Sequence, residues 1–136
     1  MYNWVRGHIT YTGKSNKNDW RKEAIRGFYA GEGDCFTFYS VTRALLEELG
    51  IEYMTVTRLG GSTHHWWVIV NIGTGWYHFD PLISRRHRLY CFMWTTEQCD
   101  KKPGFWSFDA TKYPAIATEP FDYDAVVQAE RDGLLP

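Results

Sequence analysis

The sequence has no apolar run that approaches the ~20 residues needed for a membrane-spanning helix. It has no basic excess either, since Lys plus Arg number 15, Asp plus Glu number 16, and the formal net charge is −1. Proteins that bind nucleic acid by neutralising its phosphates usually carry a surplus of basic residues. The composition therefore favours neither membrane insertion nor nucleic-acid binding.

Cysteine is scarce, and no internal repeat is present. The three cysteines, Cys35, Cys91 and Cys99, are too few for a small disulfide scaffold. Cys91 and Cys99 could pair in an oxidising compartment, although their sequence contexts do not require it. The N-terminal stretch MYNWVRGHIT also lacks the apolar segment of a signal peptide.

Aromatic side chains, by contrast, are abundant. The 136 residues include 7 Trp, 9 Tyr and 8 Phe, and 44% of the residues are hydrophobic. This content excludes intrinsic disorder, and the length fits one domain with a core of its own. We expect residues 1–136 to be a single domain taken from a longer, multi-domain protein.

Hydrophobic periodicity and capping residues predict helices followed by strands. The expected helices cover residues 19–30, about 35–49 and 124–134, with a helical turn at 95–99. The expected strands cover residues 52–59, 65–70, 76–80 and 89–94, with a hairpin loop at 71–75. Helices followed by an antiparallel meander favour the α+β class.

Cys35 is the first candidate for chemistry, because it would begin the second helix with its side chain toward the core. The positive end of the helix dipole favours a thiolate, and the unpaired N–H groups of the first turn can bind an oxyanion. The neighbouring Asp34 acts against the thiolate and is better suited to cap the helix. Activation would therefore need an imidazole partner, without which Cys35 would be an inert core residue.

The hairpin offers such an imidazole. A loop centred between residues 72 and 73 predicts three directly opposed pairs on one face, namely Ile69–Trp76, Trp67–His78 and His65–Asp80. The Cβ atoms of His65 and Asp80 would then lie ~5 Å apart, whereas a loop one residue longer would make the two residues diagonal neighbours. Asp80 would fix the tautomer of His65 and leave the other ring nitrogen for Cys35. His64 would face the opposite side of the sheet.

Other polar residues nearby are weaker candidates. The residues that we expect around a substrate cleft are Trp67, Asp34, His64 and His78. For His78, a position as a polar residue on a half-exposed strand is the favoured alternative. The basic run 85–88 is typical of a solvated loop, although it could recognise a carboxylate-bearing acyl donor. The spacing of Cys and His matches no zinc motif, so we expect no metal.

Three sequence blocks carry a family resemblance. They are Gly33-Asp34-Cys35 at a helix start, HWWVIV from His65, and GWYHFDP from Gly75 to Pro81. In this order they resemble the bacterial transglutaminase-like core domain, whose pattern reads G-x-C, H-x-W-x-x-V and G-W-x-x-x-D-P. The resemblance covers about residues 20–82, and residues 89–136 carry no motif. One departure is His64 beside His65, which leaves the base open to a one-residue misassignment.

The resemblance implies a papain-like α+β fold in which the cysteine helix packs on an antiparallel sheet. It implies that Cys35 is the nucleophile, His65 the general base and Asp80 the orienting acid, with no cofactor and no calcium. The substrate would be a protein or peptide that offers a glutamine or another amide, and the oligomeric state is not indicated. Such domains are often secreted or displayed on bacterial cells within larger proteins, while a cytoplasmic location stays open.

The acyl acceptor decides the kind of activity. Transfer to water makes a protease or amidase, and transfer to a lysine amine makes a crosslinking enzyme. We favour hydrolysis, because a domain this small has no evident acceptor-site insertion. The alternatives are a non-catalytic binding module on the same scaffold and a purely structural domain with Cys35 in its core.

Overall fold

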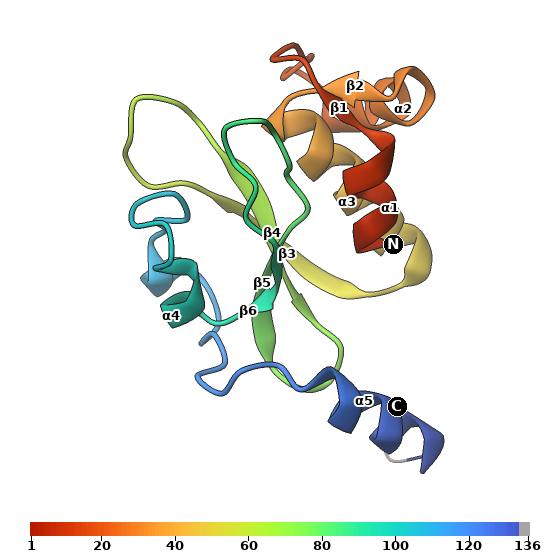
Figure 1. The fold of residues 1–136 in the computed structure, drawn as a ribbon, viewed down its shortest axis with the longest axis vertical. Coiled ribbons are helices and arrows are strands. Elements are labelled where there is room, and N and C mark those ends of the chain that lie inside the picture. The colour runs from red at the N-terminus through yellow and green to blue at the C-terminus, as the bar shows by residue number, and fades with distance from the viewer. Residues whose placement is uncertain (134–136) are drawn as a thin grey trace.

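The computed structural model describes residues 1–133 and shows helices packed against an antiparallel sheet (Figure 1). The helices are α1 (Tyr2–His8), α2 (Trp20–Ala30), α3 (Cys35–Leu49), α4 (Thr96–Cys99), the 3₁₀ turn η1 (Ala110–Lys112) and α5 (Tyr123–Arg131). The strands are β1 (Thr10–Tyr11), β2 (Glu32–Gly33), β3 (Glu52–Thr57), β4 (Trp66–Asn71), β5 (Trp76–Asp80) and β6 (Cys91–Trp94). The predicted α+β class is confirmed.

Capping residues set the bounds of the two central helices, as the sequence predicts. Asp19 caps α2 by accepting from the N–H groups of its first turn, and Gly31 ends the helix with φ 64°. Gly50 ends α3 in the same left-handed conformation, with φ 69°. None of the helices in residues 1–133 is long and apolar enough to cross a membrane. The predicted end of the last helix at Leu134 lies outside the described residues.

The main sheet has the strand order β3-β4-β5-β6, and all neighbours are antiparallel. A separate short pair joins β1 to β2 in parallel and sets Tyr11 beside Gly33, directly before the start of α3. The predicted strands are present, although β3 ends at Thr57 and β6 begins only at Cys91. Helix α3 contacts β3 and β4 of the main sheet, so the cysteine helix packs on the sheet as the resemblance implies.

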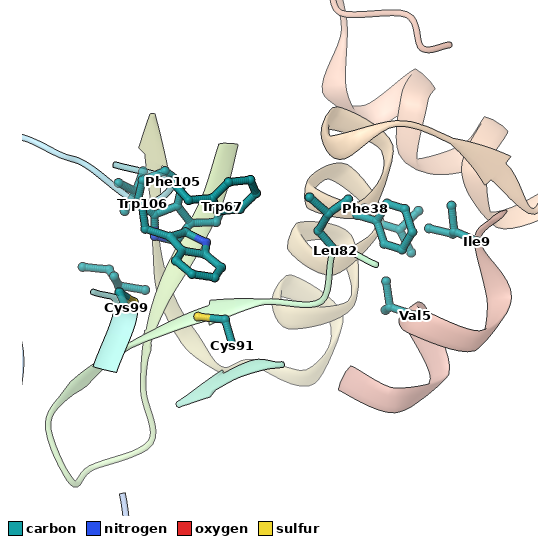
Figure 2. Close-up of a cluster of buried hydrophobic side chains, with 12 residues drawn as sticks. Val5, Ile9, Phe38, Trp67, Leu82, Cys91, Cys99, Phe105 and Trp106 are labelled. Atoms are coloured by element: carbon teal, nitrogen blue, oxygen red, sulfur yellow. The ribbon is translucent and has the colours of Figure 1, made fainter. Parts of the chain in front are cut away.

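Both faces of the sheet are covered. Val68 and Val70 of β4 point to the helical layer, where they pack with Phe36 and Tyr39 of α3. Alternate residues point the other way, and Trp67 packs there against aromatic side chains from the segment after β6, among them Phe105 and Trp106. Figure 2 shows this second cluster continuing through Leu82 to Phe38, Val5 and Ile9. The segment 95–116, which has no motif, therefore forms a second layer of the core.

Helices α2 and α3 approach closely at Gly27. A Cβ atom at this position would lie 2.5 Å from Cγ2 of Thr37 and 3.0 Å from Cγ2 of Val41. Thr37 cannot rotate away freely, because its Oγ1 accepts from the Asp34 N–H and donates to Glu23. The contact between the two helices therefore requires glycine.

We expect Gly27→Ala to lower the free energy of unfolding by about 1–3 kcal/mol, because the added methyl group overpacks the helix contact. Gly7→Ala in α1 is the matched control, since a Cβ there meets no atom within 4 Å. Alanine in place of an unconstrained helical glycine should stabilise the fold by about 0.5–1 kcal/mol. Denaturant unfolding measures both variants, and equal stabilisation by the two would contradict the close approach.

Candidate active site

Cys35 is the first residue of α3, and the turn before it is tightly held. Asp34 caps the helix by accepting from the N–H of Phe36 at 3.0 Å. In return, Thr37 Oγ1 accepts from the N–H of Asp34 at 3.0 Å, which completes a capping box. These two bonds fix the position at which Cys35 enters the helix.

His65 and Asp80 form a buried hydrogen-bonded pair. Nε2 of His65 lies 2.7 Å from Oδ2 of Asp80, and each residue is only 3% exposed. Asp80 also accepts from the indole N–H of Trp106 at 2.8 Å and from the N–H of Leu82 at 3.1 Å. The carboxylate is therefore surrounded by donors from three parts of the chain.

The surroundings of Asp80 fix its charge and the tautomer of its partner. Burial raises the pKa of Asp80, but the charge of His65 and the hydrogen bonds from His65, Trp106 and Leu82 outweigh burial and hold the pKa below its ordinary value. An ionised carboxylate can only accept, so when the His65 ring is neutral its single proton is assigned to Nε2. Nδ1 of His65 is then left as an acceptor, which is the state that a general base requires.

The strand register differs from the predicted one by two residues. Strands β4 and β5 pair Ile69 with His78 and Asn71 with Trp76, so four residues, 72–75, form the loop. The pairs predicted to be directly opposite are therefore wrong: Ile69–Trp76, Trp67–His78 and His65–Asp80. A shift of two residues preserves the faces, and His65 reaches Asp80 diagonally.

Asn71 explains the longer loop. Its side-chain oxygen accepts from the N–H of Gly73 at 2.8 Å and from that of Gly75 at 3.3 Å. These bonds satisfy the backbone of the turn and make the four-residue loop stable. The last residue of β4 thereby sets the register of the hairpin.

Cys35 and His65 border the same cavity, which has a volume of about 520 Å³. The Cys35 thiol donates to the carbonyl oxygen of His64, with an S···O distance of 3.8 Å. The structure thus joins His65 to Asp80 and brings Cys35 to the same cavity, but the thiol is bonded to a carbonyl and not to the imidazole. A reactive state requires the thiol proton to leave this carbonyl for a base.

Burial, followed by the charges of Asp34 and Asp80, raises the pKa of Cys35 to about 12. Lys17 and the N–H of Phe36 act in the opposite direction but are outweighed. The thiolate that the helix dipole favours is therefore not stable by itself at neutral pH. The thiol can react there only if a neighbouring base accepts its proton.

Two of the four residues predicted around the cleft border the cavity, namely Asp34 and His64. The ring of His64 stacks on Trp66, with ring centroids 5.7 Å apart, and its carbonyl receives the thiol of Cys35. His65, and not His64, contacts Asp80. The register of the two histidines is therefore the expected one.

Trp67 and His78 do not border the cavity, which corrects the prediction for both. Trp67 is 1% exposed, and its ring stacks against that of His65 at 5.5 Å. Its indole N–H donates to Nδ1 of His78 at 3.0 Å, while Nε2 of His78 contacts Thr96 Oγ1 at 3.1 Å. His78 is fully buried instead of half-exposed, because the segment after β6 covers this face of the sheet.

Trp106 is a functional candidate that sequence reasoning missed. It lies in the part of the chain without a motif, yet it donates to the same Asp80 oxygen as His65. An isolated tryptophan in an irregular segment gives no signal of such a contact. Only the layer that covers the sheet brings Trp106 to Asp80.

Other parts of residues 1–133 offer less chemistry. A second hollow of about 590 Å³ lies between α2 and α3, and no cysteine or histidine lines it. Within the same residues, no three Cys, His, Asp or Glu side chains are grouped as metal ligands. Cys91 and Cys99 are both buried and free.

A cysteine at the start of a helix that packs on an antiparallel sheet with a His–Asp pair is the arrangement of the papain-like α+β fold. Residues 1–81 match the model of the Transglutaminase-like superfamily, and the chain belongs to this superfamily. The fold is accordingly the transglutaminase-core form of that arrangement. A comparison with curated proteins finds no match.

Two solved structures are similar to the chain. One is a putative cysteine protease from Cytophaga hutchinsonii, with 24% identity and a TM-score of 0.49 over 59% of this chain and 28% of that one. The other is a protein called a TGase, with 15% identity and a TM-score of 0.48 over 98% of this chain and 40% of that one. The chain thus spans less than half the length of either protein.

The buried His78 predicts a pH dependence of stability. Burial lowers the pKa of His78 from 6.5 to about 4, so the folded state favours the neutral ring. The contribution of His78 to the free energy of unfolding is then fully present above pH 6.5 and is lost as the pH drops toward 4. This loss lowers the free energy of unfolding by about 2–3 kcal/mol between pH 7 and 4.5. We expect His78→Asn to be less stable at pH 7 but to lose correspondingly less on acidification. Denaturant unfolding at the two pH values measures this, and an equal loss in both proteins would contradict it.

Trp106→Phe should lower the free energy of unfolding by about 1.5–3 kcal/mol, because the buried Asp80 carboxylate loses one hydrogen bond. Trp94→Phe is the matched control, since Trp94 packs edge-on against Trp106 at 5.8 Å and makes no side-chain hydrogen bond within residues 1–133. Thermal or denaturant unfolding at pH 7 compares the two. Equal losses would show that the indole contributes by packing alone.

Proposed function

We propose that the protein catalyses thiol-dependent acyl transfer at amide or peptide carbonyls, with Cys35 as nucleophile, His65 as general base and Asp80 as orienting acid. The observation that carries the proposal is the buried His65–Asp80 pair beside the cavity that also contains Cys35. Membership of the transglutaminase-like superfamily supports the same class of chemistry. The substrate is a protein or peptide that presents a glutamine carboxamide or another amide.

The first half of the reaction forms a thioester. Nδ1 of His65 accepts the proton of the Cys35 thiol, and the sulfur attacks the carbonyl carbon of the substrate. The developing oxyanion is stabilised by the N–H of Cys35 at the start of α3. His65 then returns the proton to the nitrogen of the leaving group, the C–N bond breaks, and ammonia or an amine departs.

The second half of the reaction releases the acyl group. His65 accepts a proton from an incoming water or amine, which attacks the thioester carbon and expels the Cys35 sulfur, and the thiol is reprotonated. Water yields a carboxylic acid, and an amine yields a new amide. We propose hydrolysis as the main outcome, because exposed residues such as Thr63 and His64 border the cavity and water can reach it as an acceptor.

Asp80 acts through His65 and does not exchange protons with the substrate. It holds the Nε2–H tautomer and stabilises the imidazolium that forms when His65 accepts the thiol proton. Since burial and Asp34 favour the neutral thiol, this stabilisation is what makes a reactive sulfur accessible at neutral pH. The imidazolium–thiolate pair, and not the helix dipole alone, supplies the nucleophile.

Alkylation by iodoacetamide at pH 7 tests the proposal. We expect Cys35 to react faster than glutathione, and His65→Ala to slow this reaction by about 100-fold, since the thiol then loses its base. His64→Ala is the matched control and should retain most of the rate. Mass spectrometry of peptides assigns the label, with buried Cys91 and Cys99 as internal references. A Cys35 that reacts no faster than glutathione and ignores His65→Ala would indicate a non-catalytic scaffold.

Product analysis then separates the two outcomes of acyl transfer. A glutamine peptide is incubated with the protein, with and without a primary amine, and with Cys35→Ser as the inactive control. Glutamate or a cleaved peptide indicates hydrolysis, and an amine adduct indicates transamidation. A dominant adduct would overturn the preference for hydrolysis but not the thiol mechanism.

A further inference from the structure

The cavity beside Cys35 contains more positive than negative charge. Its charged lining residues, apart from the histidines, are Lys17, Asp34, Arg58 and Arg86. Lys17 and Asp34 form an ion pair at 2.7 Å and largely neutralise each other. No carboxylate in the part of the chain that the structure describes forms a salt bridge with Arg58 or Arg86. Two guanidinium groups therefore border the cavity without a counter-charge.

Arg58 is held in a fixed position by the protein. Its Nη2 donates to the carbonyl and the hydroxyl of Thr63 at 2.6 and 2.7 Å, and its Nη1 donates to the carbonyl of Phe105 at 3.4 Å. Its buried Nε has no hydrogen-bond partner. Neutral acceptors thus orient the group but supply no negative charge and leave part of its donor capacity unused.

The backbone of Arg58 ties this charge to the catalytic pair. Its N–H donates to the carbonyl of His65 at 2.9 Å, which extends the ladder between β3 and β4 beyond the last strand residues. A side chain fixed in this way stands at a constant position relative to the base. Little conformational entropy would be lost when it binds an anion.

Arg86 reaches the cavity from a compact turn that is separate in the chain from the segment that carries Arg58. The N–H of Ser84 donates to the carbonyl of His87 at 2.9 Å, and the N–H of His87 donates to the Ser84 hydroxyl at 2.9 Å. This turn brings Arg86 to the cavity, while its neighbours Arg85 and Arg88 lie outside it. The basic run 85–88 is therefore not a uniform solvated loop.

His87 reports the electrostatic potential of this corner. Burial lowers its pKa, and the nearby charges of Lys102, Arg86, His65 and Arg58 lower it further. Positive charges from three separate segments of the chain thus act on His87, which lines the cavity together with Arg58 and Arg86. Such a concentration of one sign in a partly enclosed site attracts anions.

We propose that Arg58 and Arg86 bind a carboxylate of the acyl donor, so that the preferred substrates carry an acidic group beside the reacting amide. Guanidinium groups suit this role because they bind carboxylates through paired hydrogen bonds and stay charged when partly buried. The inference rests on the proposed reaction at Cys35 and adds the class of substrate.

Two alkylating reagents of nearly equal size test the proposal. Iodoacetate carries a carboxylate, iodoacetamide is neutral, and both alkylate the sulfur of Cys35. The ratio of their second-order rate constants, divided by the same ratio for glutathione, measures how well the site accepts an anion. Because a higher pH and longer times make even an unactivated thiol react, the ratio can be measured whether or not Cys35 is catalytic.

We expect the wild-type ratio to exceed that of glutathione and Arg86→Gln to lower it by about three- to tenfold, the effect of one nearby charge in a partly screened site. Arg85→Gln removes an equal charge outside the cavity and should change the ratio less than twofold. Arg86→Lys should retain part of the preference. Because Arg58→Gln also removes structural hydrogen bonds, its ratio is compared only after its fold has been checked by circular dichroism.

The outcomes separate this inference from the proposed function. A high ratio with a slow absolute rate would support anion binding and reject catalysis, whereas a fast rate with the ratio of glutathione would reject anion binding alone. Equal effects of Arg86→Gln and Arg85→Gln would also overturn the inference, because only general surface charge would then be acting. Where turnover is found, a Glu–Gln donor peptide should have a higher kcat/KM than its Gln–Gln counterpart.

Discussion

The site depends on a buried negative charge, the carboxylate of Asp80. An ionised group in a protein interior is stable only when hydrogen bonds and an opposite charge replace its lost hydration. Asp80 receives these from the imidazole of His65, the indole of Trp106 and the N–H of Leu82. Its own backbone carbonyl also accepts from the hydroxyl of Tyr2, at 2.8 Å. Helix α1, the hairpin and the tail segment therefore meet at one residue, and the site is complete only when all three are folded.

The state of Cys35 follows from competing electrostatic effects. The helix dipole at the N-terminus of α3 favours the thiolate of Cys35, but its effect on the pKa is small compared with that of burial. Burial and two nearby carboxylates favour the neutral thiol and raise its pKa. The same burial strengthens the His65–Asp80 interaction, since charges interact more strongly away from water. A low-dielectric site that suppresses the isolated thiolate can therefore still support an imidazolium–thiolate pair.

Local rules in the sequence predict most of the elements and one face of the site. Asp19, Asp34 and Gly50 mark helix ends through chemistry that acts within a few residues, and the structure has those ends. The shared face of His65 and Asp80 follows from the alternation of side chains, which survives a register error of two residues. The register itself depends on the Asn71 side chain, whose preference for the turn backbone is not visible in hydrophobic patterning.

Long-range packing accounts for what the sequence does not reveal. Trp67 and His78 lie on the face of the sheet on which cleft residues are expected, but a tail of irregular structure buries both. The indole N–H of Trp67 donates to His78 beneath that tail. The partner of Asp80 in that tail, Trp106, cannot be inferred from periodicity because the tail follows none. The position of this tail is set by the face of the sheet on which it packs, and not by a periodic pattern in its own sequence. The tail nevertheless completes the site, because it supplies Trp106.

The positions of the proposed base, His65, and of Arg58 are linked through the sheet. Arg58 and His65 are hydrogen-bonded through their backbones, and the Arg58 side chain continues to Thr63 and Phe105. Phe105 in turn packs against the His65 ring at a centroid distance of 4.7 Å and precedes Trp106. Any movement that opens the cavity by displacing this tail segment disturbs Arg58, His65 and Asp80 together. Arg58, the proposed anion-binding group, and His65, the proposed base, are therefore held by one hydrogen-bonded and packed unit, while Arg86 belongs to a separate turn. An acidic donor bound as proposed would therefore be positioned relative to His65 mainly by Arg58, whose hydrogen bonds join it to the strand of His65 and to the tail segment.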